Sequence, residues 1–553
     1  VEVGGGAVML RAVPKTKAAA RALAGRQGQA VAHIVADRVT HAPTTSAGAR
    51  APVPLYPHTP QSYSHAGQAV ATGDFNGDGY DDMAVGLPGT FADGLPYAGS
   101  VEVFFGTQSG KFSAAADLVL HGASPFSRFG AALAYVDLNK DGLADLAVAA
   151  PTEGLSLMAY TGTVYVFLGS RSSSSRSGPP ANTTPAYTLV GSAGTQDTTT
   201  LGITLAAGDV DGDGFADLLV GSPHASPAGL RQAGAVWAVL TSEFEALAAS
   251  KCEAARAGAG GVTCALTTVA SATLEGTAAF QWLGHSVSVS TCGAPLLLVS
   301  SPYLRRCADD PCTSFQDSDV QGIGALWAGT YAGGGKLVPS FVLEGQSEYE
   351  MLGGAAAVGC PVDAHTPYLA VASPTANVTG RVGVLKHEWA QAGIVSLAPL
   401  HDLLGRGTLS SADFHTAAVA TLQGDRPLAR FGAGVWFADV SGDGTQDLVV
   451  AAPSRSNDWT GFLAGHDNGA VFVFNGGSDF VHRTAECACA TLALVRPCPC
   501  HCASVCAVPA AATRERFGSS VAPSARAKLL LVGAFTESGS ARLGGMAYTV
   551  PCA

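Results

Sequence analysis

The chain has 553 residues, a formal net charge of -12, 47% hydrophobic residues and only 13% charged residues. This balance excludes an intrinsically disordered protein, which would be highly charged and poor in apolar side chains. The acidic charge is the wrong sign for a surface that follows nucleic-acid phosphates, and no apolar run approaches the roughly 20 residues of a membrane-spanning helix.

Residues 1–51 are expected to form an N-terminal extension with a strand and a helix. Gly6 to Arg11 has the composition of a short strand, and the Ala- and Arg-rich stretch from Pro14 to His41 spaces its apolar side chains roughly as a helix does. The chain begins with Val1 and shows no signal-peptide pattern, so we expect a processed N-terminus without its targeting information.

A repeat dominates the rest of the chain, residues 52–553. Each copy starts with an aromatic-Gly, Leu-Gly or Ala-Gly pair, and the glycines lie 63 to 86 residues apart, at positions 67, 130, 202, 284, 353, 432 and 518. Each copy contains short segments rich in Val, Ala and aromatic residues, which are typical of strands. Seven copies of this length predict an all-β fold, a seven-bladed β-propeller of four-stranded antiparallel blades.

The seventh copy lacks a fourth strand. A propeller ring is closed by pairing its last blade with the start of the chain, so we expect an N-terminal strand to complete this blade. The sequence leaves two candidates open, Gly6 to Arg11 and Ala51 to Tyr56.

Four copies carry an acidic loop between their first and second strands, with the pattern Asp-x-[Asp/Asn/Ser]-x-Asp-Gly-x-x-Asp. Side-chain oxygens at positions 1, 3, 5 and 9, with the backbone carbonyl of position 7, form a ligand set suited to Ca²⁺. Position 12 is Val in all four copies, whereas an EF-hand needs Glu there, so an EF-hand is excluded. The ligands in the first two loops are Asp74, Asn76, Asp78, Tyr80 and Asp82, then Asp137, Asn139, Asp141, Leu143 and Asp145. Those in the other two are Asp209, Asp211, Asp213, Phe215 and Asp217, then Asp439, Ser441, Asp443, Thr445 and Asp447.

The alternative is a set of acidic β-turns, because Asp, Asn and Gly are ordinary turn residues. Four copies at equivalent places in a repeat favour four structural Ca²⁺ sites. The corresponding loops of copies four, five and seven lack the ligands, and we expect those blades to be metal-free. No catalytic motif was found: a Gly-x-Ser-x-Gly elbow, a His-Glu-x-x-His helix and a phosphate-binding loop are all missing from the sequence.

Thirteen cysteines favour an oxidising, secretory compartment. Short spacings suggest the disulfides Cys252–Cys264 and Cys307–Cys312, and a Cys-rich insertion at 485–508 is expected to form further disulfides in preference to a zinc site. The sequons at Asn182 and Asn377 are candidate glycosylation sites.

The combination of Phe-Gly, acidic loop and Ala-Ala-Pro resembles the FG-GAP repeats of integrin α-chain propellers. Arg128-Phe129-Gly130 followed by Asp137 to Gly142 is most similar to the propeller part of the glycosylphosphatidylinositol-specific phospholipase D family. The resemblance implies a secreted or cell-surface, calcium-stabilised module that binds a protein or glycan ligand as part of a larger adhesion assembly. The alternative it implies is the non-catalytic propeller portion of such a hydrolase, whose zinc-containing catalytic domain has no match in this sequence. Ligand binding is expected on the longer loops, which include residues 243–263, 303–319 and 388–413.

Overall fold

The computed structural model describes the greater part of the seven repeats. The described residues are 2–4, 7–9, 53–55, 61, 63–108, 112, 115–156, 159–171, 183–191, 199–254, 261–305, 321–363, 365–382, 385–424, 428–454, 469–478, 480–481, 516, 518–524, 529–534 and 546–551.

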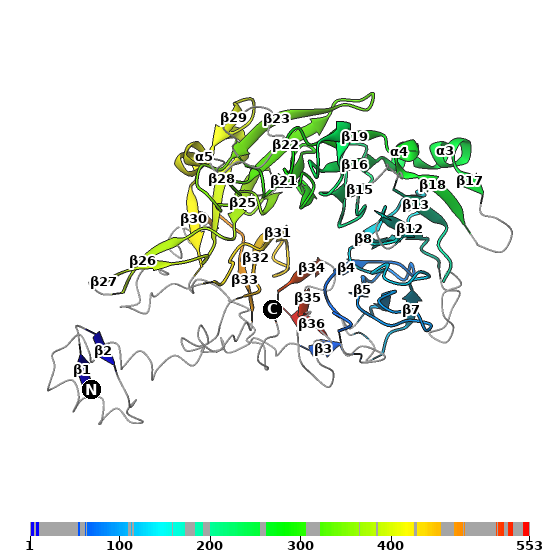
Figure 1. Ribbon diagram of the computed structural model, residues 1–553, viewed down its shortest axis with the longest axis horizontal. Coiled ribbons are helices and arrows are strands. Elements are labelled where there is room, and N and C mark those ends of the chain that lie inside the picture. The colour runs from blue at the N-terminus through cyan, green and yellow to red at the C-terminus, as the bar shows by residue number, and fades with distance from the viewer. Residues whose placement is uncertain are drawn as a thin grey trace.

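Seven small sheets follow one another around a ring, as predicted from the repeat (Figure 1). The first three blades contain β4 (Val70–Gly73), β5 (Asp82–Leu87), β6 (Ser100–Phe104) and β7 (Leu118–His121); β8 (Leu133–Val136), β9 (Asp145–Ala150), β12 (Thr163–Phe167) and β13 (Tyr187–Val190); and β14 (Thr204–Gly208), β15 (Asp217–Ser222), β16 (Ala235–Val239) and β19 (Ala272–Glu275). The next two contain β20 (Val287–Val289), β21 (Leu297–Ser301), β22 (Ala325–Tyr331) and β23 (Leu337–Glu344); and β24 (Ala355–Gly359), β25 (Tyr368–Ser373), β28 (Ile394–Pro399) and β30 (Ala420–Gln423). The sixth and seventh contain β31 (Gly434–Ala438), β32 (Asp447–Ala452) and β33 (Ala470–Phe474), and β34 (Ser520–Ser524), β35 (Leu529–Ala534) and β36 (Met546–Pro551).

The second strands of the blades are deeply buried. Every residue of β5, β9, β15 and β32 is buried, including the aspartate that begins each of these strands. A strand buried on both faces reads as a continuous apolar run, and the Val, Leu and Ala runs of the repeat have this form. Their side chains pack between neighbouring blades, as Leu218 and Val220 of the third blade do against the second.

The glycine of each repeat lies against the blade before it. All seven glycines have a positive φ, and a Cβ at Gly130 would lie 2.6 Å from the carbonyl oxygen of Ser100 in the first blade. Gly67 of the first blade approaches the seventh in the same way, because a Cβ there would lie 2.4 Å from the carbonyl oxygen of Met546. Only glycine tolerates both this backbone conformation and this spacing, so its recurrence sets the close packing of adjacent blades.

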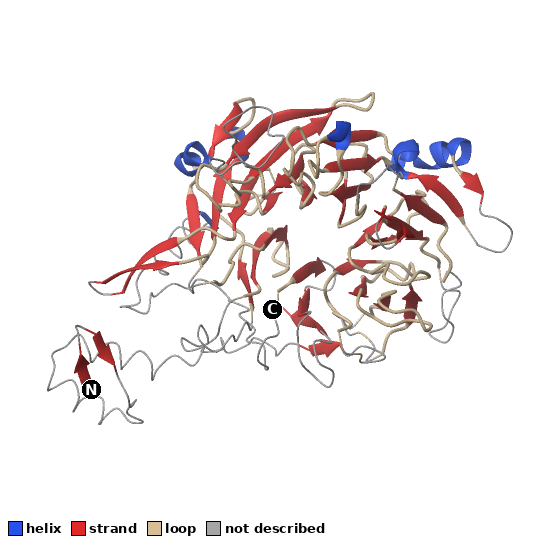
Figure 2. Cartoon of the chain, viewed as in Figure 1, coloured by secondary structure: helices blue, strands red, loops and turns tan. Residues whose placement is uncertain are grey.

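Two blades are extended by strands that come from the blade after them. The segment α3 (Thr241–Lys251), β17 (Glu253–Ala254), β18 (Val262–Ala265) and α4 (Leu266–Val269) leaves the third blade, and β18 pairs in parallel with β13 of the second. The segment η2 (Leu400–Asp402), β29 (Gly407–Ser410) and α5 (Ser411–Ala417) leaves the fifth blade, and β29 pairs in parallel with β23 of the fourth. Figure 2 shows these helices at the rim of the ring. The antiparallel prediction therefore holds within the blades but missed these two parallel additions.

The outer strand of the seventh sheet comes from the start of the chain. β3 (Val53–Leu55) pairs antiparallel with β36, whereas β2 (Ala7–Met9) pairs with β1 (Glu2–Gly4). Of the two candidate segments, only the second has its described residues, Val53–Leu55, paired with the last blade. That this pairing is what closes the ring stays a prediction.

The remaining elements are short. They are η1 (Pro227–Gly229), β10 (Gly154–Ser156), β11 (Ala159–Tyr160), β26 (Val378–Val382) and β27 (Leu385–Trp389). Among the residues described, none of the helices has the length and apolar content needed to cross a membrane.

Candidate metal centres

The four acidic loops, here called the metal loops (74–82, 137–145, 209–217 and 439–447), connect the first and second strands of blades one, two, three and six. Each ends on the aspartate that begins the second strand. These four aspartates are fully buried: Asp82, Asp145, Asp217 and Asp447.

The buried aspartate ties its loop to two other parts of the blade. In the second blade, Asp145 Oδ2 accepts a hydrogen bond from Leu138 N at 2.9 Å, and its Oδ1 accepts one from Gly169 N, just after the third strand, at 2.8 Å. The other three loops repeat both bonds, with Phe75 and Gly106, Val210 and Thr241, and Val440 and Gly476 as donors. Position 9 therefore fixes the loop with or without a cation.

The half-buried first aspartates of the loops fold back on the loop backbone. Oδ2 of the first aspartate accepts from the glycine N–H at position 6 in every loop, at 2.9 to 3.0 Å. These glycines have φ between +83° and +90°: Gly79, Gly142, Gly214 and Gly444. The sharp turn predicted at position 6 is thus present, and the acidic-turn alternative describes part of what these side chains do.

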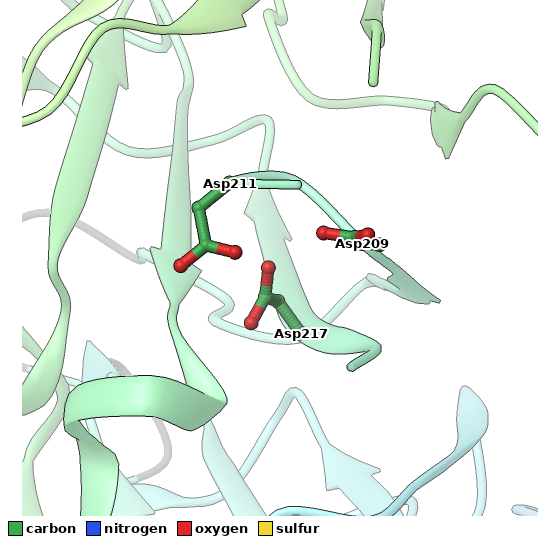
Figure 3. A group of neighbouring side chains, drawn as sticks. All are labelled: Asp209, Asp211 and Asp217. Carbon is green, nitrogen blue, oxygen red and sulfur yellow. The ribbon is translucent and has the colours of Figure 1, made fainter. Parts of the chain in front are cut away.

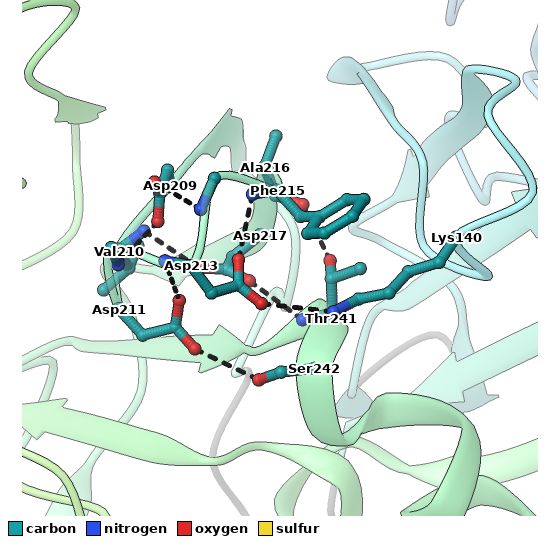
Figure 4. A network of polar contacts seen from close by, with 12 residues as sticks. Lys140, Asp209, Val210, Asp211, Asp213, Phe215, Ala216, Asp217, Thr241 and Ser242 are labelled. Carbon is teal, nitrogen blue, oxygen red and sulfur yellow. Dashed lines mark hydrogen bonds and ion pairs between the residues drawn. The ribbon is translucent and has the colours of Figure 1, made fainter.

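The loop of the third blade brings its carboxylates together. Oxygens of Asp209, Asp211 and Asp217 all lie within 4.8 Å of one another, the one such trio found in the described part of the chain (Figure 3). Neighbouring segments hold this loop in place (Figure 4): Ser242 Oγ at the start of α3 donates to Asp211 Oδ2 at 3.0 Å, and Lys140 Nζ lies 3.1 Å from Asp213 Oδ2.

Lys140 was not predicted to belong to this site. It lies at position 4 of the second blade's loop, with φ +58° where the other three loops have glycine, and its ammonium group also lies 4.2 Å from the centre of the Phe215 ring. It thereby joins the metal loops of two successive blades. The departure from glycine at position 4 was the available sequence signal.

Burial and neighbouring carboxylates raise the pKa of the buried aspartates. The pKa of Asp82 and of Asp145 rises to about 7 because burial penalises the charged carboxylate, and the nearby Asp78 and Asp141 add to the effect. Burial raises the pKa of Asp217 to about 6, helped by Asp211 and Asp213. A cation would offset this cost of ionisation.

The donor set fits a hard cation. Every predicted side-chain ligand is an oxygen, and carboxylate oxygens that accept one hydrogen bond keep a further lone pair for a metal. A loop-bound Ca²⁺ would neutralise carboxylates that otherwise repel one another. The predicted ligands are close together in sequence in all four loops, and in the third loop three of their carboxylates converge in space.

The loops without acidic ligands have another connection. Cys292, between β20 and β21, and Cys360, directly after β24, form a disulfide across 68 residues of sequence. This pair was not predicted, although both cysteines lie in the loops that lack metal ligands. The predicted pair Cys252–Cys264 is confirmed.

Several predicted residues lie outside the described part of the chain. They are Asn182, Cys307, Cys312 and the insertion at 485–508. Asn377 is described and exposed, and its Oδ1 accepts from Gln391 N at 3.0 Å; its glycosylation stays a prediction.

The opposite face of the ring presents large apolar side chains. Residues four positions before the repeat glycine have left-handed backbone and are 41 to 57% exposed in four blades: Tyr63, Phe126, Tyr349 and Leu428. Three of them donate their N–H to a carbonyl of the preceding blade: Phe126 to Pro96, Tyr349 to Gln321 and Leu428 to Ala390. Tyr97, 47% exposed, stacks on Phe126 with ring centres 5.9 Å apart. Because strands alternate in direction, these loops lie at the ends of the blades away from the metal loops. We call this set, with Phe91 and Tyr303, the aromatic face.

Comparison with known proteins agrees with this architecture. A family model described as the FG-GAP repeat matches residues 66–104, 129–167 and 201–239. The phosphatidylinositol-glycan-specific phospholipase D of Bos taurus is 31% identical over 504 residues, covering 88% of this chain and 54% of the relative, and that of Homo sapiens is 31% identical over 500 residues, covering 87% and 54%. Integrin alpha-3 of Cricetulus griseus is 36% identical over 170 residues, covering 29% of this chain and 14% of the relative. The chain thus carries FG-GAP repeats in a seven-bladed propeller and is homologous to these proteins, as the sequence resemblance predicted. It spans about half the length of the phospholipases D it matches.

Proposed function

We propose that the chain is a calcium-stabilised extracellular propeller that binds a protein or glycan ligand through its aromatic face. The observation that supports this proposal is that large apolar side chains are exposed four residues before the repeat glycine in four of the blades. A left-handed conformation is unfavourable for bulky residues, and exposed apolar surface gathered on one face is a common mark of an interaction site. Aromatic residues suit both protein partners and sugar rings, because they offer a large rigid contact surface.

The expected binding role of the long loops changes accordingly. Residues 243–263 include most of α3, all of β17 and the first half of β18, and residues 388–413 include β28, β29 and the start of α5. The strands β17 and β29 lie at outer sheet edges and β28 is an inner strand of the fifth blade, so these segments build sheets and we assign binding to the aromatic face instead.

Two disulfides support an extracellular location. Cys252–Cys264 and Cys292–Cys360 require an oxidising compartment to form and persist. Calcium at the millimolar concentrations found there would load sites of about 10⁻⁴ to 10⁻³ M affinity, the range of extracellular modules.

A second candidate function is the non-catalytic propeller portion of a phosphatidylinositol-glycan-specific phospholipase D. Identity of about 30% along nearly the whole chain favours it, whereas the integrin match covers under a third. In that case the aromatic face would bind the glycan part of the substrate, while cleavage would belong to another part of the protein. The two candidates differ in the ligand and share the binding surface.

The test compares binding of the chain to an array of free glycans, glycosylphosphatidylinositol glycans and extracellular proteins, in calcium. The triple variant F126N/Y349N/L428N removes apolar surface while keeping a residue that tolerates left-handed backbone. V338T/V419T, at two equally exposed apolar positions elsewhere, is the control. We expect the triple variant alone to lose at least tenfold in affinity; equal binding by both variants would refute the assignment of the face.

A further inference from the structure

The loops of blades four and five are joined to each other, in the position where other blades have metal loops. The disulfide connects Cys292 and Cys360. Beside it, Thr291 donates from both N and Oγ1 to the carbonyl oxygen of Val358, at 3.1 and 3.0 Å. A covalent bond and two hydrogen bonds therefore make one unit of two loops that lack acidic ligands.

A single side chain connects this unit to the metal loop of the sixth blade. Gln446, at position 8 of that loop, accepts a hydrogen bond from Cys360 N at 2.6 Å through Oε1 and donates to Thr291 Oγ1 at 3.1 Å through Nε2. Position 8 is Asp81, Ala144 or Ala216 in the other metal loops. Gln446 thus contacts the loops of both preceding blades.

A second contact connects the same loops from the other side of Asp447. Asp447 Oδ1 accepts from Gly476 N at 2.8 Å, and the next residue, Gly477, donates its N–H to the carbonyl oxygen of Pro361 at 2.7 Å. Two adjacent glycines, Gly476 and Gly477, therefore connect Asp447 to Pro361, the residue after Cys360. Hydrogen bonds on both sides of Asp447 thus connect this metal loop to the Cys360 loop.

We propose that the Cys292–Cys360 disulfide clamps blades four and five where a loop-bound cation would otherwise act, and that through Gln446 it holds the sixth blade's loop ready to bind Ca²⁺. The second part rests on the calcium binding proposed above. A ligand binds more tightly when the binding conformation is already favoured in the free protein. Losing the disulfide or the Gln446 bonds should therefore weaken calcium binding at 439–447 and leave the second blade's loop unaffected.

Hydrogen exchange measured by mass spectrometry, across a Ca²⁺ titration, reads each loop separately. The variants are C292A/C360A and Q446L, the latter retaining side-chain size without the hydrogen bonds. C252A/C264A is the matched control, because it removes a disulfide within the inserted segment of the third blade. Peptide mapping without reductant first establishes both disulfides in the parent chain.

We expect both test variants to raise the calcium midpoint for protection of 439–447 by about three- to tenfold, the effect of one or two hydrogen bonds. The midpoint for 137–145 should stay unchanged, and the control should change neither. An unchanged midpoint at 439–447 in Q446L would overturn the coupling, even if C292A/C360A fails to fold. If calcium protects no loop of the parent chain from hydrogen exchange, the proposed calcium binding is wrong. The clamp is tested separately, without metal: C292A/C360A should lose protection at 287–299 and 355–369, and unchanged protection there would refute the clamp.

Discussion

At the scale of single residues, the aspartates of the metal loops have two different roles, as predicted cation ligands and as anchors of the loop. The sequence pattern does not distinguish these roles. The first aspartate of each loop is half-buried, whereas the ninth is fully buried and accepts backbone hydrogen bonds through both oxygens. The spacing predicted that both are ligands, but it could not show that position 9 also anchors the loop to the end of the third strand. That contact joins Asp145 to Gly169, 24 residues away.

Substitution in the second blade distinguishes the two roles. Asp145→Ala leaves the N–H groups of Leu138 and Gly169 without their acceptor, so we expect a loss of about 2 to 4 kcal/mol of unfolding free energy even in EDTA. Asp137→Ala should weaken calcium binding but change stability in EDTA by less than about 1 kcal/mol. Chemical denaturation in EDTA and in calcium measures both. Equal effects in EDTA would contradict the anchoring role.

The raised pKa values predict a pH dependence that reverses the usual behaviour of carboxylates. Without metal, the folded chain keeps Asp82 and Asp145 protonated up to a pKa of about 7, whereas in the unfolded chain they ionise at about 4. The folded state then binds more protons between these values, so its unfolding free energy falls as pH rises from about 4 to 7.

Calcium competes with these protons, and its stabilising effect should therefore grow over the same pH range. Calorimetry in EDTA and in calcium at pH 5 and pH 8 should give a larger difference in melting temperature at pH 8. A difference that is the same at both pH values would show that the buried aspartates do not bind the cation.

At the scale of elements, β3 is expected to close the ring. It adds three residues to the edge of the seventh blade, with Val53 opposite Thr549 and Leu55 opposite Ala547. Pro54 has no N–H to donate, which an edge strand tolerates. Removing residues 1–60 should lower the melting temperature clearly relative to removing 1–50, and should reduce hydrogen-exchange protection over Ala547 to Thr549, which keep their pairing with β35. Equal stability of the two truncated chains would mean that packing between the first and seventh blades suffices.

Most of the elements could be predicted because the same sequence pattern recurs in seven copies of the repeat. The alternating segments, the repeat glycines and the four metal loops all occur where their spacing placed them. The strands β18 and β29 could not be assigned, because a run of four residues does not indicate that it pairs with the preceding blade. The disulfide Cys292–Cys360 was missed for a related reason: its partners are distant in sequence and are brought together only by the stacking of blades four and five.

At the scale of the whole molecule, the two ends of the blades have separate tasks. One end holds the metal loops and the interblade disulfide, which join neighbouring blades. The other carries the aromatic face, whose side chains extend from loops that those neighbours support. In the proposed function, this division lets the interblade contacts at one end fix the positions of the ligand-binding side chains at the other.

Stabilisation of this ring by calcium is the proposal on which the others depend. Bound metal can be counted by elemental analysis of the chain after dialysis against calcium, and the melting temperature can then be followed as EDTA is added. We expect four Ca²⁺ per chain and a marked fall in melting temperature on chelation. Calcium should restore the melting temperature, whereas an equal concentration of magnesium, which retains its water shell more strongly, should not. A chain that holds no calcium and melts at the same temperature with and without EDTA would contradict this proposal.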